Sequence, residues 1–134
     1  MTISKIVLVM LVTSVCSGCI NSQRPKETVT GVSALIYRSS DLDAQLVSVR
    51  GWIEIEPETY RFWDSRAAMD NGHDQTQCVG VVLPQGINRA GLDRSEVVVQ
   101  GTFVSDVSGK YLVLGGCQVR RFILVERIQR LEDR

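Results

Sequence analysis

Two segments of the chain, residues 47–53 and 97–103, repeat the pattern Val-x-Val-x-Gly-x-(Ile or Phe). In each, two valines, a glycine and a large apolar residue recur at the two-residue period of a β-strand and therefore share one face. Both segments are predicted to be half-buried strands. A glycine inside a strand costs stability unless the backbone bends sharply or another segment passes close to it. Gly51 and Gly101 are therefore predicted to be corners of a barrel.

The remaining elements are short and separated by turn signals. Residues 33–37 with Leu42 form a brief amphipathic pattern that predicts a short helix or turn. Further strands are expected at residues 61–64, 78–83, 111–114 and 118–128, with a turn at 106–109. In the last segment the apolar positions change phase at Arg120 and Arg121, which predicts a β-bulge there. A terminal helix is the alternative for that segment.

Short strands with glycine corners and little helix predict a mainly β fold. The expected architecture is a small five-stranded barrel, closed or partly closed, with a short N-terminal helix. Residues 47–52, residues 96–103 and the apolar terminal strand together resemble the OB-fold barrels of small uncharacterised bacterial envelope proteins. The resemblance covers about residues 32–130. It implies an OB-like architecture and no active site.

The start of the chain has the pattern of a removable export signal. A positive start is followed by an apolar run, Ile6–Val12, that is too short to span a bilayer as a helix. Residues 17–19, Ser-Gly-Cys, resemble the lipobox of bacterial lipoproteins, which implies a lipid on the thiol of Cys19 and cleavage just before it. Cys16 is the alternative acceptor, but Val15 before it is bulkier than the small residues usual at that place. An ordinary soluble-secretion signal is the other alternative.

These features predict three parts of the chain. Residues 1–18 are a cleaved lipoprotein signal peptide, residues 19–30 are the lipidated cysteine with a flexible polar tether, and residues 31–134 are the OB-like domain. The residue after the acceptor is Ile20 and not Asp, which in lipoproteins favours the outer membrane. The expected location is the bacterial cell envelope, lipid-anchored in the outer membrane and facing the periplasm.

The four cysteines divide by position. Cys16 leaves with the signal and Cys19 carries lipid, so Cys78 and Cys117 remain in a compartment where disulfides persist. We expect these two to form a structural disulfide. A redox or metal-binding pair is the alternative, but the Cys-x-x-Cys spacing is missing and the chain has 1 histidine.

Charge and motifs argue against several classes of function. The chain has 15 Lys and Arg against 15 Asp and Glu, so no basic excess favours nucleic acid. Residues 70–74 around His73 are rich in oxygen ligands but lack the EF-hand frame, and a solvated turn is the preferred interpretation. Ser65 or Ser95 with His73 lacks any nucleophile frame. We therefore expect no catalytic residues, no metal and no cofactor.

Trp52, Trp63 and Arg50 are the candidate ligand-binding residues. Trp52 and Arg50 lie on the outward face of the first repeat strand, and OB-fold proteins bind oligonucleotides or oligosaccharides on an outer face where aromatic rings stack. In the alternative interpretation both indoles pack beneath residues 64–77, because tryptophans are highly buried on average.

The expected function is a non-enzymatic binding or adaptor module, anchored to the membrane by lipid, whose partner is an envelope protein or an oligosaccharide. One alternative is an inhibitor of an attacking lysozyme or protease that inserts residues 64–77 into the target's cleft. Another is a small hydrolase that uses His73.

Overall fold

The computed structural model describes residues 27–57, 59–106, 117 and 121–132. The signal peptide, Cys19, most of the turn expected at 106–109 and the strand expected at 111–114 lie outside these residues. The elements in chain order are β1 (Glu27–Val29), α1 (Val32–Tyr37), α2 (Ser39–Leu42), β2 (Leu46–Glu56), β3 (Thr59–Trp63), α3 (Arg66–Asn71), the 3-10 turn η1 (Gln75–Gln77), β4 (Cys78–Val82), β5 (Ser95–Val104) and β6 (Phe122–Arg130). Within the described residues, no helix has the length and hydropathy needed to cross a membrane.

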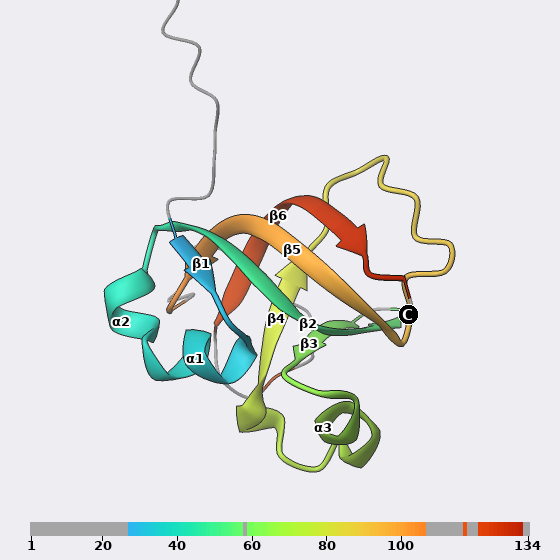
Figure 1. Ribbon diagram of the computed structural model, residues 1–134, viewed down its shortest axis with the longest axis horizontal. Coiled ribbons are helices and arrows are strands. Elements are labelled where there is room, and N and C mark those ends of the chain that lie inside the picture. Colours follow the sequence, from blue (N-terminus) through green and yellow to red (C-terminus); the bar gives the residue numbers. More distant parts are fainter. Residues whose placement is uncertain (1–26, 58, 107–116, 118–120, 133–134) are drawn as a thin grey trace, which may run out of the picture.

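Six strands form one mixed sheet in the order β1-β2-β3-β4-β6-β5, and β5 pairs in addition with β2. This second pairing brings the far end of the sheet back to β2, so the sheet curves into a partial ring (Figure 1). β1 runs parallel to β2 and β4 parallel to β6, whereas the other pairs are antiparallel. The prediction of a mainly β chain with a short N-terminal helix is confirmed. The sheet has six strands and not five because β1 adds to it.

The two repeat segments are paired with each other. Val49 lies opposite Val99, and each glycine lies opposite a valine of the other strand, Gly101 opposite Val47 and Gly51 opposite Val97. The four valines are fully buried. A Cβ on Gly101 would lie 2.1 Å from the carbonyl oxygen of Leu124, and one on Gly51 would lie 2.5 Å from that of Trp63. Both strands are confirmed, and both glycines permit the close approach of another backbone.

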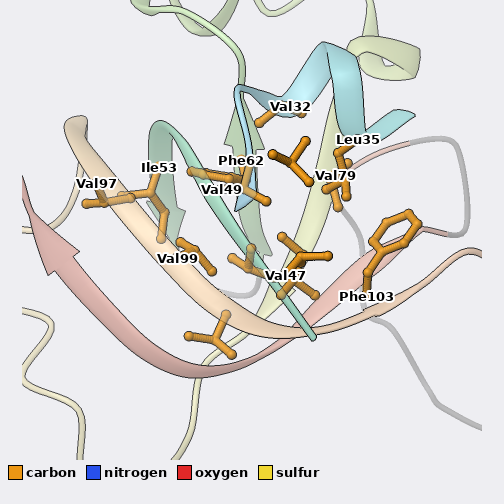
Figure 2. Close-up of a cluster of buried hydrophobic side chains, with 14 of the residues drawn as sticks. Val32, Leu35, Val47, Val49, Ile53, Phe62, Val79, Val97, Val99 and Phe103 are labelled. Atoms are coloured by element: carbon orange, nitrogen blue, oxygen red, sulfur yellow. The ribbon is translucent and has the colours of Figure 1, made fainter. Parts of the chain in front are cut away.

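The core fills the space between the curved sheet and α1. Val32 and Leu35, one helical turn apart, face the sheet and are fully buried, as is Leu42 of α2. Figure 2 shows Val32 and Leu35 directed toward side chains of the strands. Burying one such side chain contributes about 1.5–3 kcal/mol. The short amphipathic pattern at residues 33–37 therefore corresponds to α1, which covers the core where the sheet does not.

The ordered sheet begins before the boundary that the polar tether predicts. Glu27, Thr28 and Val29 pair with residues 47–49 of β2, and Val29 is 3% exposed. Arg38, after α1, forms an ion pair with Glu27. A segment of three residues is too short to show the two-residue period of a strand. β1 therefore forms because β2 pairs with it and Arg38, after α1, binds Glu27.

The last strand, β6, contains a bulge. Gln100 pairs with Arg127 and Gly101 pairs with Val125, which leaves Glu126 as an extra residue in β6. β6 begins at Phe122, and Arg120, where the sequence predicts a bulge together with Arg121, lies outside the described residues. Pairing with β5 continues to Arg130, so the alternative of a terminal helix is wrong for residues 122–130.

Candidate binding face

The outer face of β2 and β3 brings together most of the candidate residues. In the antiparallel register Trp52 lies opposite Trp63 and Glu54 opposite Arg61. Opposite residues of an antiparallel pair share a face, and Ile53 and Phe62 of the same strands are fully buried on the core face. We call the outer surface formed by Arg50, Trp52, Glu54, Arg61 and Trp63, with α3 above it, the tryptophan face.

Helix α3 is fastened onto this face. Its N-cap residue Ser65 accepts a hydrogen bond from the backbone N–H of Ala68 at 3.1 Å, and Gly72 ends it in the left-handed conformation. Met69 on its inner side is 2% exposed and clusters with Trp63 and Cys78. Helix α3 is therefore folded onto the sheet (Figure 1), and Asp64 just before it accepts a hydrogen bond from the N–H of Ser33 in α1 at 3.0 Å.

The two tryptophans occupy different environments. Trp63 is 1% exposed beneath α3, and its indole N–H has no hydrogen-bond partner among the described residues. Trp52 is half-buried and packs at the margin of the same cluster. The arrangement leaves Trp52 as the indole that reaches the surface, with Trp63 as its buried support.

Cys78 and Cys117 are joined by a disulfide. Cys78 is fully buried and lies opposite Trp63 in the register of β3 and β4. Cys117 is partly buried against the same cluster. The bond ties the segment before β6 to the start of β4, directly beneath the tryptophan face.

Two arginines flank Trp52. The guanidinium carbon of Arg66 lies 5.9 Å from the centroid of the Trp52 ring, a cation–π distance, and its Nε lies 3.6 Å from Asp70 Oδ2. On the other side, Nε of Arg50 donates to Oε1 of Glu96 at 2.6 Å. This hydrogen bond and the charge of Glu96 raise the pKa of Arg50. Both side chains remain largely exposed, 61% for Arg50 and 71% for Arg66.

A chain of ion pairs fixes the position of α3. Asp70 on α3 binds Arg94, and Arg94 Nη1 lies 3.8 Å from Oε2 of Glu54 on β2. Glu54 Oε1 in turn lies 3.4 Å from Nε of Arg61 on β3. Arg94 itself has a positive φ of 56°, and its N–H donates to the carbonyl of Ile53 at 2.8 Å. The two acidic and two basic side chains balance each other's charge. Their ion pairs connect α3, the loop that contains Arg94, and strands β2 and β3.

The residues considered for catalysis are not brought together. His73 is exposed in the turn after α3. Its neighbour Asp74 accepts hydrogen bonds from the hydroxyl of Thr76 and from the N–H of Thr76, and these lower the pKa of Asp74. Ser65 caps α3, and the hydroxyl of Ser95 donates to the carbonyl of Leu92. No cluster of three or more metal-ligating side chains is found in the part of the chain that the structure describes.

Sequence reasoning missed Arg66, Asp70 and Arg94. A signal for the first two was present, since Ser65 and Gly72 have the residue types of a helix start and stop, and Arg66 and Asp70 stand four residues apart between them. The role of Arg94 depends on a distant segment and has no local signal.

No protein-family model matches the sequence, and no curated protein matches it. Among solved structures, a crystal structure of a DUF3299 family protein from Pseudomonas aeruginosa PAO1 is similar to the chain, with a TM-score of 0.44 and 15% sequence identity. The similarity covers 70% of this chain and 66% of that chain.

Proposed function

We propose that this protein is a non-enzymatic binding module of the bacterial cell envelope, anchored by lipid on Cys19, and that the tryptophan face binds its partner. The observation that carries the proposal is the position of Trp52, half-buried between two largely exposed arginines on a support of buried side chains. Aromatic and arginine side chains on a rigid surface are the residue types that dominate binding energy at interfaces.

The order of the strands supports an OB-like barrel as the scaffold of this module. The pairings run from β2 through β3, β4, β6 and β5 and return to β2, with β4 and β6 parallel. An OB-fold is a five-stranded, partly open Greek-key barrel that binds oligomers on its outer surface and adjoining loops. In this proposal β1 is an addition to the barrel.

The amino-terminal pattern supports the location. Residues 17–19 provide the acceptor for a lipid, and Ile20 favours the outer membrane with the domain in the periplasm. The balanced charge of the chain disfavours nucleic acid as the partner. An envelope protein or an oligosaccharide is the proposed partner class.

Photo-crosslinking in intact cells tests the proposal. A photoreactive amino acid in place of Ala67 is expected to capture a partner, because Ala67 is exposed on α3 next to Arg66 and its replacement keeps both arginines. The control position is Tyr37 on α1, which is 92% exposed and is not part of the tryptophan face. Capture at 37 with none at 67, or equal capture of the same molecule at both positions, contradicts the proposed face.

Inhibition of an attacking lysozyme or protease is a second candidate. One observation favours it: residues 64–77 are capped, packed and tied by Asp70 to Arg94, and a preorganised segment loses little entropy when it enters a cleft. Alanine at Asn71, His73 and Asp74, which are exposed near the end of α3, is expected to abolish inhibition of the target enzyme. Inhibition that survives these changes rejects the inserting segment.

A further inference from the structure

The arginines beside Trp52 share an arrangement that points to the chemistry of a ligand. Arg50 and Arg66 each engage a carboxylate of the same chain through Nε, Glu96 for the first and Asp70 for the second. Within the described residues, no hydrogen bond from a terminal nitrogen of either guanidinium group is found. Each side chain is therefore paired through Nε, and its terminal nitrogens keep their N–H donors.

The outer edge of a guanidinium matches a carboxylate. Its two terminal nitrogens point N–H donors in the same direction, and a carboxylate accepts from both at once. Anchoring Nε to Glu96 or Asp70 reduces the entropy that binding would otherwise cost. Each of the two arginines is thus preorganised to bind one carboxylate group.

Trp52 lies between these two arginines. Arg50 precedes it by two residues on the same face of β2, which places their Cα atoms about 7 Å apart along the strand. Arg66 lies over the indole from α3. The large apolar ring can pack against the C–H face of a sugar, while the neighbouring Ser48, also on the outer face of β2, offers a hydroxyl.

The arrangement of charges on the tryptophan face favours one kind of anionic ligand over another. Glu96 pairs with Arg50 and Asp70 pairs with Arg66, and Glu54 pairs with Arg94 in the same region. A polyanion with a charge at every unit, such as a nucleic acid, would bring phosphates close to these carboxylates. An oligomer with isolated carboxylates meets only the guanidinium edges.

We propose that the tryptophan face binds an acidic oligosaccharide, with a sugar ring packed on Trp52 and a sugar carboxylate held by the terminal nitrogens of Arg50 or Arg66. This inference rests on the proposed function and names its ligand class. Binding is reversible and involves no covalent step.

The test uses the mature lipidated protein in detergent micelles, with isothermal calorimetry as the readout. The probe is a hyaluronan oligosaccharide, which carries a carboxylate on every second sugar, and the neutral comparison is a chitooligosaccharide of the same length. We expect the acidic chain to bind about tenfold tighter or more, the size of one charged hydrogen-bonded contact. Arg50→Gln and Arg66→Gln are each expected to weaken it by about the same factor.

Matched variants separate recognition from folding. Arg38→Gln removes the same charge at the end of α1 and is expected to leave binding unchanged. Trp52→Phe keeps an aromatic ring in the cluster and is expected to bind more weakly than the wild type but more tightly than Trp52→Ala. Far-UV circular dichroism of each variant verifies the fold.

Three results would overturn the inference: no binding of the hyaluronan oligosaccharide, equal binding of the neutral chain, or tighter binding of a thymidine oligonucleotide that depends on the same arginines. Photo-capture of a partner at position 67 alongside any of these results would leave the proposed function standing. Loss of that capture would reject the face itself.

Discussion

Gly101 shows how a single residue controls the approach of two strands. The Cβ of any other residue there would lie 2.1 Å from the carbonyl oxygen of Leu124 and 2.9 Å from the Cα of Val125. Both atoms belong to the backbone of β6, which cannot move without breaking its pairing with β5. Gly80 in β4 differs, because its Cβ would meet its neighbours at 3.4 Å.

We expect Gly101→Ala to lower the free energy of unfolding by about 1–3 kcal/mol, the usual cost of overpacking. Gly80→Ala is the matched control, also in a strand, with an expected change below about 1 kcal/mol. Urea denaturation followed by circular dichroism measures both. Equal destabilisation by the two variants would show that the contact with Leu124 is not the cause.

Asp43 joins the loop after α2 to the end of β5. Its Oδ1 accepts a hydrogen bond from the N–H of Ser105 at 2.9 Å, and this bond is the main reason why the pKa of Asp43 is lowered. Because that pKa is lower in the folded than in the unfolded chain, the ionised carboxylate stabilises the fold. The contribution is present above about pH 4 and is lost as the pH falls through the lower folded value.

Asp43→Asn is therefore expected to make the free energy of unfolding depend less steeply on pH below about pH 4. Urea denaturation at a series of pH values between neutral and strongly acidic gives the two curves. Asp41→Asn serves as the control, since its carboxylate accepts no hydrogen bond from the described residues. Parallel curves for Asp43→Asn and the wild type would reject the contribution of this hydrogen bond.

At the scale of elements, the disulfide links two parts of the ring that are distant in sequence. Cys78 at the start of β4 and Cys117 before β6 are separated by 39 residues. Closing a loop of this length restricts the unfolded chain, which stabilises the folded one by about 2–4 kcal/mol.

The double variant Cys78→Ala with Cys117→Ala is expected to lose about 2–4 kcal/mol of unfolding free energy. A reducing agent should lower the stability of the wild type by a similar amount and leave the double variant unchanged. If the agent has no effect on the wild type, the bond does not contribute as we expect.

Elements with a sequence period were predictable, and those without one were not. The alternation in residues 47–53 and 97–103 predicts β2 and β5, and the amphipathic pattern of residues 33–37 with Leu42 predicts the short helix or turn where α1 lies. β1 is three residues long and depends on pairing with β2. For residues 64–77 the sequence predicts a loop with a turn at residues 70–74, although Ser65 and Gly72 have the residue types that begin and end α3.

For the whole molecule, the proposed tether limits how far the domain can lie from the membrane. β1 begins at Glu27, so the seven residues 20–26 separate the sheet from the proposed lipid on Cys19, and the span from Cys19 to Glu27 is at most about 29 Å. In the proposed function the domain therefore stays close to the membrane surface.

Metabolic labelling with a radioactive fatty acid tests this anchor. We expect label in the wild type and in Cys16→Ser, and none in Cys19→Ser, because of the two cysteines near the start of the chain only Cys19 follows two small residues. Cell fractionation should find the labelled protein in the outer membrane. Label retained in Cys19→Ser, or lost in Cys16→Ser, would move the acceptor to Cys16.

The sequence by itself determined which residues of the repeat strands face inward, where the glycines allow close approach, and which two cysteines remain to pair. These follow from local periodicity and from a count of residues. Only the tertiary structure decided that the two repeats pair with each other, that Trp63 is buried while Trp52 reaches the surface, and that Arg66 lies over Trp52. The physical reason is that alternation along a strand places side chains on a common face, whereas the element that covers that face comes from a distant part of the chain.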